Sequence, residues 1–540
     1  MVTVGLYGIR DTTHGQQPTY THDHGVVIMR DGRVESVVEL ERWTGRKHDN
    51  RLHRYLPEIL AAMVPPEEIV RFASVNAFVG SSFVSDDGNF RIEPRQEVSI
   101  SDEPVPADVI WYPDGINRRP AEGWVVCHEL AHVASVLPFC GSFENGALAA
   151  HVDGGAYRSA SSFWRVESGR LRLEEASWEG LKDVVNNFNV NPAVRSILGF
   201  ASEEHLSIPG KLMGYAVLGR PDGEMEEWLR SNGWFLGLDD RVAAEKVMER
   251  IGSLDPRNSR CQDLCASIQL AFEKAVVQKF VEQSRHSGTL YYSGGAGLNV
   301  PTNTKLLQYF DNVYVPPATN DSGLALGAAA WLEYLDRGSL PIHSPFLSTF
   351  DCPVSEPSVD AIKDVADALV SGKVIGVCNG AGEIGPRALG HRSILALADS
   401  VELRIRVSET IKKREWYRPL APILCADAAG QVLEPKALES RLSRWMLGSW
   451  SVKPQWHQHL AGVVNVGGMV RAQVVDNDGH NEWMHALLSY LWEKFGVPAL
   501  INTSFNGHGL PIVQRHDEAL RLAAELGLDG VVVHGCLHRF

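Results

Sequence analysis

Two histidines four residues apart are the first candidates for chemistry in this chain. His128 and His132 lie in the segment HELAH, which fits the H-E-x-x-H pattern of zinc proteases. On a helix, residues i and i+4 project from one face, so both imidazoles can hold one metal ion. The extended metzincin pattern also needs a glycine and a third histidine, at positions that here hold Ser135 and Pro138. That protease class is excluded, and two structural histidines remain an alternative to a metal pair.

A second set of candidates is basic and lies near the C-terminus. Arg387 occurs in GPRALG, three further cations occur in KKREWYRPLAP, and one follows later: Lys412, Lys413, Arg418 and Arg471. Guanidinium forks suit bidentate phosphate contacts, and lysines supply mobile positive charge. A run of charge is usually a solvated face. The apolar surroundings of Arg387 and Arg418 favour a phosphate site instead.

Small polar and glycine-rich turns follow several predicted strands. Asn502, Ser504 and Asn506 in NTSFN offer donors at a strand end, where backbone N–H groups can also hold an oxyanion. An ordinary polar turn has the same composition. Glycines at 154, 155, 294, 295 and 297 let the backbone approach a nucleotide closely, and Asn299 can bond its ribose or adenine. Each glycine turn taken alone is also compatible with a simple hairpin.

Strands and helices that would position these residues are readable from the pattern. Two β-rich runs flank Asp31-Gly32, which predicts a hairpin with a type I′ turn. A helical pattern begins at His128 and stops by Pro138. The segments ALAAHVDGG, GTLYYSGG and VPALINTSFNG are each typical of a buried strand that runs into a turn. A further helix is expected over residues 358–371.

Length and composition limit the class of protein. The 540 residues suffice for two to four domains, and the formal net charge of -15 argues against a surface built for nucleic acid. The start MVTVGLYGI lacks the features of a signal peptide, and no apolar run is long enough to span a membrane. Eight scattered cysteines indicate reduced thiols and a cytoplasmic protein. Prolines cluster before residue 358, so we expect domains over 1–340 and 358–540, joined by a linker at 341–357.

Nine motifs in order resemble the antibiotic and nodulation-type O-carbamoyltransferases, the family of the tobramycin and geldanamycin enzymes. In the N-terminal region they are THDHGVVIMRDGRVESVVELERWTGRKHD, HELAHVAS, HVDGGAYRSASSFW, GKLMGYAVLG, SGGAGLN and PPATNDSGLALGAA. In the C-terminal region they are EIGPRALGHRS, KKREWYRPLAP and LINTSFNGHGLPI. One H-E-x-x-H match shows little, but nine motifs over nearly the whole chain are a specific signal.

This resemblance implies an α/β protein with two catalytic units. The expected N-terminal domain has an actin/Hsp70-like (Kae-type) ATPase fold, and the C-terminal domain is YrdC-like, similar to the domain that makes threonylcarbamoyl-adenylate. The C-terminal domain would use carbamoyl phosphate and ATP with Mg²⁺ to make carbamoyl-adenylate. The N-terminal domain would transfer the carbamoyl group to a hydroxyl of a small-molecule acceptor, expected to be an antibiotic-type natural product. A homodimer is compatible with the sequence, and neither nucleic acid nor membrane is an expected partner.

The resemblance also implies roles for particular residues. A metal ion, iron in relatives, would be held by His128, His132, Asp153 and Asp321, while Glu129 would be incidental. Two histidines and two carboxylates suit Fe²⁺ or Zn²⁺, and the sequence does not choose between them. His22 matches the histidine near the acceptor hydroxyl, and a neutral imidazole there could take its proton. The remaining matches are on the N-terminal nucleotide side: Gly154, Lys211, Met213, Gly214, Gly294, Gly295, Asn299 and Ser322.

One departure from the family pattern and three alternatives stay open. The segment NVGG, from Asn465 to Gly468, replaces a family His-Val-Asp-Gly and so removes a histidine and a carboxylate beside the expected phosphate site. A tRNA threonylcarbamoyl-transferase relative would share both domain types, but the net charge of -15 disfavours it. An actin-like regulatory ATPase would lack GPRALG and KKREWYRP. A zinc protease is remote.

Overall fold

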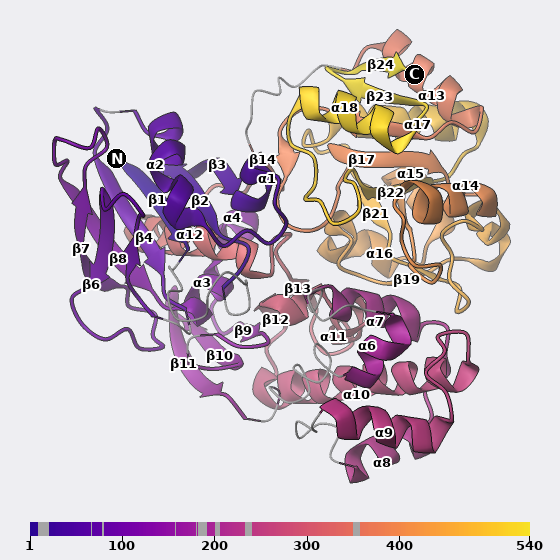
Figure 1. Ribbon diagram of the computed structural model, residues 1–540, viewed down its shortest axis with the longest axis horizontal. Helices are drawn as coiled ribbons and strands as arrows, with labels where there is room; N and C mark the ends of the chain where they lie inside the picture. The colour runs from indigo at the N-terminus through magenta and orange to yellow at the C-terminus, as the bar shows by residue number, and fades with distance from the viewer. Residues whose placement is uncertain are drawn as a thin grey trace.

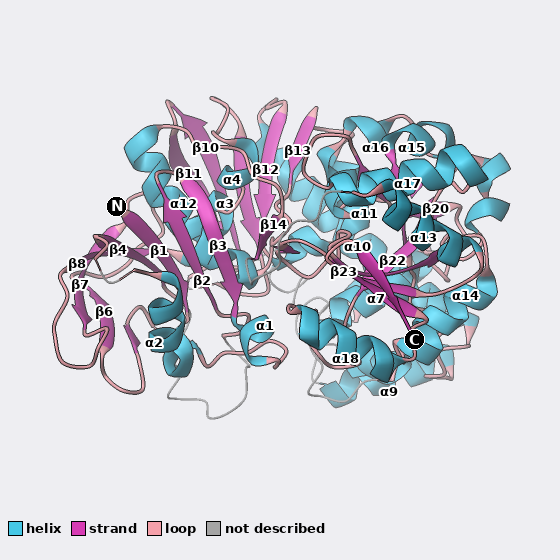
Figure 2. Cartoon of the chain, turned by 90° about the horizontal axis from the view of Figure 1, so that it is seen from above, coloured by secondary structure: helices cyan, strands magenta, loops and turns pink. Residues whose placement is uncertain are grey.

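The computed structural model shows an N-terminal part with two sheets, a helical part and a C-terminal part with a third sheet (Figure 1). It describes residues 1–8, 21–65, 67–77, 80–156, 158–179, 181, 192–199, 206–232, 240–348 and 357–540. Seen from above, the strands gather in two blocks, one N-terminal and one C-terminal, with helices around them (Figure 2). The predicted α/β class is confirmed.

The described residues form a first sheet of eight strands, in the order β3-β2-β1-β4-β8-β7-β6-β5. The strands are β1 (Val2–Tyr7), β2 (Gly25–Arg30), β3 (Arg33–Glu39), β4 (Val70–Val75), β5 (Phe83–Val84), β6 (Phe90–Pro94), β7 (Val105–Trp111) and β8 (Ala121–Val126). β1, β2 and β3 are antiparallel neighbours, β4 is parallel to β1, and β8 is parallel to β4. Asp31 and Gly32 have φ of 51° and 78°. The predicted type I′ hairpin is therefore confirmed.

A second sheet repeats the topology of the first. The described residues give it the order β11-β10-β9-β12-β13. The strands are β9 (Leu148–Val152), β10 (Ser161–Glu167), β11 (Arg170–Ser177), β12 (Thr289–Ser293) and β13 (Asn312–Tyr314). Three antiparallel strands are again followed by two strands parallel to the first of them. The order matches β3-β2-β1-β4-β8, so the N-terminal part consists of two topologically equivalent halves.

Two buried helices pack between these sheets. α12 (Leu324–Arg337) packs on β1, β2 and β4, whereas α3 (His128–Ala134) packs on β9 and β12, and the two helices contact each other. A Cβ atom at Gly327 would lie 1.8 Å from the carbonyl oxygen of Ala131, so this crossing requires a glycine. The short turn η4 (Asp321–Gly323) leads directly into α12. The packing thereby brings the start of α3 and the start of α12 together.

Helices between β11 and β12 form the helical part. They are α6 (Pro192–Leu198), α7 (Ile208–Ala216), α8 (Gly223–Ser231), α9 (Asp240–Ile251) and α10 (Ser259–Ser284), and α11 (Val300–Leu306) follows β12. α10 packs on α7, α8 and α11. α7 in turn faces the C-terminal part, because a Cβ atom at Gly214 would lie 2.8 Å from Cδ of Pro419. Edge-to-face contact between Tyr215 and Tyr417, with centroids 5.1 Å apart, extends this junction.

The described residues of the C-terminal part form a seven-stranded sheet in the order β21-β18-β22-β17-β15-β23-β24. The strands are β15 (Ile375–Cys378), β17 (Arg392–Leu397), β18 (Ala421–Cys425), β21 (Gln473–Val475), β22 (Leu500–Ser504), β23 (Gly530–Val533) and β24 (Cys536–Arg539). α13 (Val359–Val370) and α17 (Glu482–Phe495) share one apolar core with the sheet, and α18 (His516–Leu526) packs on β15 and β23. The expected helix over 358–371 corresponds to α13.

The segment between the two parts contains a strand as well as a connection. β14 (Phe346–Ser348) pairs with β16 (Gly382–Glu383) and packs on β3. Residues 349–356 of the predicted linker lie outside the described residues. The first half of the expected 341–357 linker is therefore ordered by contacts with both parts.

A buried ion pair of the N-terminal part holds a loop of the C-terminal part. Glu39, at the end of β3, pairs with Arg42 of α1 (Leu40–Thr44) at 2.8 Å. Arg42 Nη1 donates to the carbonyl of Glu383, and its Nη2 donates to that of Gly385 at 2.8 Å. In return, the N–H of Gly385 donates to Glu39 Oε1 at 3.0 Å. We call these four residues the 39–42/383–385 junction.

Among the described residues, no helix combines the length and the apolar character that crossing a membrane requires.

The 39–42/383–385 junction leads to a stability prediction. Replacing Arg42 with Ala removes two hydrogen bonds to carbonyls and leaves the Glu39 carboxylate buried without its cation. We expect the Arg42→Ala variant to lose about 3–5 kcal/mol in the free energy of unfolding or of domain docking. Chemical denaturation and limited proteolysis between residues 340 and 360 would measure it.

An exposed arginine provides the matched control. Arg95 pairs with Asp108 at 2.9 Å on the surface, and Arg95→Ala should lose no more than about 1 kcal/mol, as exposed pairs do. Equal losses in the two variants would contradict the assignment of the junction as the contact that fixes the domains.

Candidate active site

Four ligand-type side chains converge between the two N-terminal sheets. Nε2 of His128 and Nε2 of His132 lie 3.1 Å apart. Asp321 Oδ1 lies 3.4 Å from Nε2 of His132 and 3.7 Å from Nε2 of His128, and Asp153 Oδ2 lies 3.7 Å from Nε2 of His132. Two ring nitrogens that face each other can share only one proton, so a hydrogen-bond network alone accounts poorly for them. Two imidazoles and two carboxylates fit a metal ion such as Zn²⁺ or Fe²⁺.

The protonation states of this cluster suit metal binding. His128 and His132 are fully buried, and burial, helped by the neighbouring His132, lowers the pKa of His128. Burial raises the pKa of Asp321, but His22, His132 and His128 together lower it further, so the net pKa is below its usual value. A neutral imidazole and an ionised carboxylate result at neutral pH, and these are the forms that bind metals.

Neighbouring groups orient the carboxylates of the cluster. The hydroxyl of Tyr7, at the end of β1, donates to Asp321 Oδ2 at 2.8 Å. The N–H groups of Gly154 and Gly295 donate to Asp153 Oδ1 and Oδ2, each at 2.5 Å. Two predicted glycines therefore act through their backbone on a predicted ligand. Partners of this kind fix the direction of ligand oxygens.

His22 lies beside the cluster and is bound to Asp23, which accepts hydrogen bonds from three groups. Asp23 accepts from His22 Nδ1 at 3.0 Å, from His48 Nδ1 at 2.7 Å and from Asn320 Nδ2 at 2.9 Å. Burial lowers the pKa of His22, but Asp321, Asp23 and Asp153 raise it, to about 10. A cation held by Asp321 would counter this effect, so the proton affinity of His22 depends on the charge of the cluster.

Glu129, the second residue of HELAH, is not among the described groups whose ligand atoms converge. Its buried Oε1 accepts from the N–H of Arg158 and from the hydroxyl of Ser159, both at 3.1 Å. The carboxylate thus holds the turn that follows Asp153. This geometry provides no general base of the zinc-protease type.

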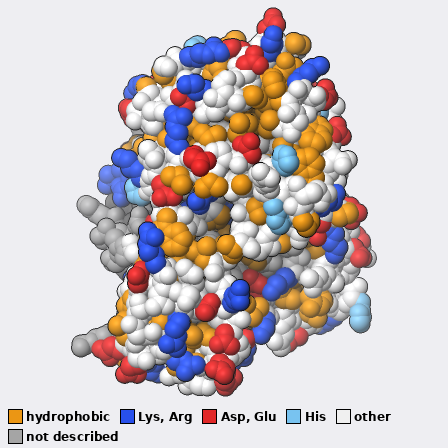
Figure 3. Space-filling view, turned by 90° about the vertical axis from the view of Figure 1, so that its right-hand side faces the viewer, with side chains coloured by type: hydrophobic (Ala, Val, Ile, Leu, Met, Phe, Trp, Pro, Cys, Tyr) orange, Lys and Arg blue, Asp and Glu red, His pale blue; other side chains and the backbone are white. Residues whose placement is uncertain are grey.

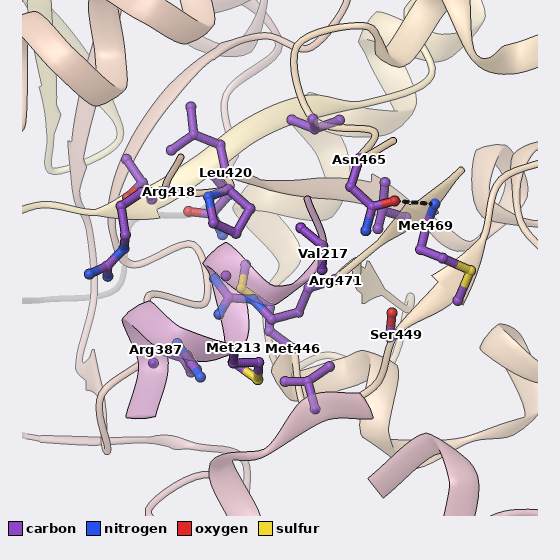
Figure 4. A pocket seen from close by; sticks show the side chains of 18 of the residues that line it. Met213, Val217, Arg387, Arg418, Leu420, Met446, Ser449, Asn465, Met469 and Arg471 are labelled. Carbon is purple, nitrogen blue, oxygen red and sulfur yellow. Dashed lines mark hydrogen bonds between the residues drawn. The ribbon is translucent and has the colours of Figure 1, made fainter. Parts of the chain in front are cut away.

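A cavity lies between the C-terminal sheet and α7 (Figure 4). Arginines line it on the C-terminal side, together with the end of β22: Arg387, Arg414, Arg418, Arg471, Asn502, Thr503 and Ser504. α7 and α11 supply the facing wall: Gly210, Met213, Gly214, Val217, Val300 and Pro301. The cavity thus joins residues that the sequence assigns to two separate sites in two domains. Asn465 of the NVGG segment also lines it and accepts from the N–H of Met469 at 3.0 Å.

The four guanidinium groups repel one another. Burial and the nearby Arg418 and Arg414 lower the pKa of Arg387 to about 10. Burial, Arg418 and Arg471 likewise lower the pKa of Arg414 to about 9, and the pKa of Arg471 falls well below its usual range. Arginine side chains stay protonated in proteins at neutral pH, so the cavity concentrates positive charge. An anionic ligand such as a polyphosphate would compensate it.

Polar residues at the end of β22 support the arginines. Asn502 Nδ2 donates to the carbonyl of Ala388 at 3.1 Å and to Gln473 at 2.9 Å, which fixes the loop of Arg387. Arg414 Nη2 donates to Ser504 Oγ at 3.4 Å. Lys412 is buried behind this turn and donates to the carbonyls of Ser504 and Asn506, at 2.6 and 2.5 Å. Lys412 therefore shapes the site from outside the cavity lining.

Several predicted ligand contacts lie elsewhere. Lys413 is exposed, and Asn506 donates to the carbonyl of Leu510 at 2.7 Å. Asn299 caps α11 through Thr302 and pairs with Gln269 at 3.0 Å. Lys413 and Asn299 lie outside the cavity lining, whereas Asn506 accepts from the hydroxyl of Ser504 at 2.7 Å and so lies directly beside that lining. Lys211, on α7, pairs with Glu415 at 2.7 Å, and Ser322 donates to Asn320 at 3.0 Å.

Other residues of the site were not identified from the sequence. Arg414 lies within the quoted KKREWYRP, and its place between two predicted cations was the available signal. Tyr7, Asp23 and His48 carry no spacing signal, because their contacts join segments that are distant in the chain.

One loop contact connects the two centres. A Cβ atom at Gly385 would lie 2.4 Å from the carbonyl oxygen of Pro317 and 3.0 Å from Cα of Ala318. Gly385 also has φ of 83°, so both space and conformation require a glycine. Arg387 follows two residues later on one chain segment, and Asp321 follows three residues after Ala318 on the other.

Comparisons with known proteins identify the family of this chain. The family profile described as "Carbamoyltransferase N-terminus" matches residues 121–330, and "Carbamoyltransferase C-terminus" matches residues 366–539. "Nodulation protein U" of Rhizobium fredii is 38% identical over 93% of this chain and 91% of that protein. "Nodulation protein NolNO" of Sinorhizobium fredii is 28% identical over 98% of this chain and 80% of that protein.

Among solved structures, an activator of 2-hydroxyisocaproyl-CoA dehydratase from Clostridium difficile with bound ADPNP is similar to part of the chain. It is 11% identical, covers 62% of this chain and 95% of its own, and has a TM-score of 0.32. That score is too low to support a conclusion.

The convergent cluster leads to a prediction about metal content. We expect His132→Ala to lower the affinity for Fe²⁺ or Zn²⁺ by more than the roughly 10- to 100-fold that loss of a supporting partner causes. Metal analysis after equilibration with a weak chelator would measure it. His286 is exposed, and His286→Ala should keep the full metal content. Equal metal content in both variants would disprove the site.

Glu129 leads to a second prediction. Glu129→Gln keeps an oxygen acceptor for Arg158 and Ser159, so we expect its metal content and activity to stay within a few-fold of the original. Loss of a general base would instead reduce the rate by roughly 10²–10⁴-fold. Steady-state rates of the Gln variant distinguish the two roles. Glu129→Ala should lower the melting temperature, because it leaves the turn after Asp153 without its acceptor.

Proposed function

We propose, from the premise that this chain belongs to the carbamoyltransferase family, a two-step transfer that passes through carbamoyl-adenylate. The protein is an enzyme, a carbamoyltransferase. The proposed donor is carbamoyl phosphate, activated with ATP and Mg²⁺, and the proposed acceptor is a hydroxyl group. The observation that carries this proposal is the four-arginine cavity closed by α7 of the helical part.

The folds of the two parts are proposed to match this division of work. Numbered within each half, the strands of both sheets have the order 3-2-1-4-5, and helices pack between the two sheets. This arrangement supports an actin-like N-terminal domain. The mixed seven-stranded sheet carries the arginine cavity at the end of β22 and at the segments that precede β17 and β18. It supports, at a coarser level, the expected YrdC-like adenylating domain.

The first half-reaction would take place in the arginine cavity. Water takes the phosphoryl group of carbamoyl phosphate, which breaks the P–O bond and releases carbamate and inorganic phosphate. An oxygen of carbamate then attacks the α-phosphorus of ATP, and pyrophosphate leaves. Two anions must approach each other in this step. Arg387, Arg414 and Arg471 would lower that electrostatic barrier, because their charge is already fixed and poorly hydrated before the ligands bind. Met213 and Gly214 of α7 would contact the nucleotide on the opposite wall.

The second half-reaction would take place near the histidine cluster. His128, His132, Asp153 and Asp321 would hold a transition metal ion, which supplies a Lewis acid for the carbamoyl oxygen. The acceptor oxygen forms a bond to the carbamoyl carbon, and AMP leaves with the bonding electron pair. Tyr7 would keep Asp321 oriented during this step.

His22 is proposed to take the proton of the acceptor hydroxyl. Its Nδ1 is directed to Asp23, so Nε2 is the nitrogen that would accept the proton once a cation held by Asp321 has lowered the pKa of His22 and left its ring neutral. Asp23 would then stabilise the imidazolium, as an aspartate does in other general-base pairs. His48, bound to the other oxygen of Asp23, holds that carboxylate in place.

The acceptor is proposed to be a small molecule such as a sugar or macrocycle. Lys and Arg are interspersed with Asp and Glu on the face shown in Figure 3, and the net charge is -15. Neither feature suits the broad basic surface that binding of a tRNA requires. The two relatives compared over most of the chain are named as nodulation proteins.

Separate assays of the two half-reactions would test the function. The protein should release pyrophosphate from ATP only when carbamoyl phosphate is present, and carbamoyl-adenylate should be detectable by mass spectrometry. Incubation with hydroxyl-bearing sugars and macrocycles should then give a product heavier by one carbamoyl group. ATP cleavage to ADP, without pyrophosphate, would contradict the proposal.

Arg387 leads to a sharper prediction. We expect Arg387→Ala to reduce the rate of pyrophosphate release by about 10²–10³-fold, the scale for loss of one preorganised electrostatic group. Arg387→Lys should recover only part of the rate, because one ammonium does not reproduce a two-pronged contact. Arg539, on the surface, pairs with Asp364, and Arg539→Ala serves as the matched control. Normal pyrophosphate release by Arg387→Ala would place the adenylating site elsewhere.

A further inference from the structure

His151 is a buried histidine that no part of the proposed reaction uses. It lies in β9, where the other residues are Leu148, Ala149, Ala150 and Val152, and its side chain is fully buried. Its Nε2 has no hydrogen-bond partner among the described residues. A buried polar atom without a partner is unfavourable by about 1–3 kcal/mol. A bound ligand would supply the partner that this nitrogen lacks.

Strand geometry directs this histidine to the metal cluster. Alternate residues of a strand face the same side, so His151 and Asp153 share the face of β9 that α3 covers. A ring nitrogen of His151, a ring nitrogen of His132 and a carboxylate oxygen of Asp153 all lie within 4.8 Å of one another. The ring centroids of His151 and His132 are 5.0 Å apart. Both neighbours are proposed ligands.

The contacts of the other ring nitrogen favour a metal-binding tautomer. Nδ1 of His151 lies 3.4 Å from Ser162 Oγ, and that oxygen accepts from the indole N–H of Trp164 at 2.9 Å. If Nδ1 carries the proton and donates a hydrogen bond to Ser162 Oγ, the free lone pair of the ring is on Nε2. Metal-binding histidines commonly donate their second N–H to a neighbouring acceptor in this way.

We propose that His151 is a further ligand of a divalent transition metal ion held with His132 and Asp153. This inference rests on the metal site of the proposed function and extends its ligand set to three imidazoles and two carboxylates. An additional nitrogen ligand favours Zn²⁺, Fe²⁺ or Co²⁺ over Mg²⁺, which prefers oxygen ligands. The site therefore selects a borderline metal ion, whereas the Mg²⁺ that accompanies ATP belongs at the phosphates.

Metal titration of matched variants would test the proposal without any assay of activity. Metal-free protein is titrated with Co²⁺ and Zn²⁺ against a competing chelator, and the visible absorption of the Co²⁺ form is recorded. His151→Phe keeps a ring beside His132 but has no nitrogen. We expect its dissociation constants to rise by about 10- to 100-fold, with a changed Co²⁺ spectrum. His151→Val, a good strand residue, should behave alike and serves if the Phe variant is not folded.

Two controls separate the outcomes. His24 is also buried, with no partner for either nitrogen among the described residues, and it is absent from the groups whose ligand atoms converge. His24→Phe should bind Co²⁺ with the original affinity and spectrum. Original affinity and spectrum in both His151 variants, with weak binding in His128→Ala, would overturn the role of His151 alone. Original affinity in His128→Ala as well would overturn the whole metal site.

Discussion

The buried pair of Glu39 and Arg42 is the contact on which the arrangement of the two active centres depends. Both side chains are buried, and each bonds the backbone of residues 383–385 in the other part of the chain. Apolar surfaces can slide over one another, but a buried ion pair that also bonds backbone groups is satisfied in one arrangement only. The same loop touches Pro317 on its other side. One junction therefore fixes Arg387 relative to the segment that carries Asp321.

The metal cluster depends in turn on the repeated topology of the N-terminal part. Tyr7 ends β1, His128 follows β8, Asp153 follows β9, and Gly295 follows β12. These positions are at the carboxyl ends of strands that are parallel or equivalent in the two halves, where α/β proteins usually place their ligands. Packing α3 against α12 at Gly327 then closes the space between the sheets. Ligands from three distant segments, and the groups that orient them, can meet there because the two halves repeat one arrangement.

Local spacing made part of this predictable from the sequence. The i, i+4 histidines, the Asp31-Gly32 hairpin and the strand that ends at Asp153 each depend on a few consecutive residues, and the structure has them as expected. Tyr7 and His151 carry no such signal. A tyrosine or histidine in a predicted strand is usually interpreted as a core residue, and only the position of the opposite sheet shows that it faces a site. Lys413 shows that a local sequence signal can also mislead. It shares a basic run with Arg414, but only Arg414 of these two lines the cavity. The helical segment ends at Ile411 and Lys413 has a left-handed φ of 48°, so the path of the backbone separates the two side chains, and the number of charges does not.

The position of the arginine cavity changes how the two half-reactions relate. From sequence, Met213 and Gly214 belong to one site and Arg387 to another, each within its own domain. In the structure they face each other across one cavity, and Gly214 is in contact distance of Pro419. An adenylate formed against the arginines would therefore already touch the domain that uses it. Because a reactive acyl-phosphate intermediate is protected where water is excluded, a site enclosed by both domains favours direct transfer over release into solution. The buried junction at Glu39 and Arg42 would then serve the proposed chemistry as well as the fold.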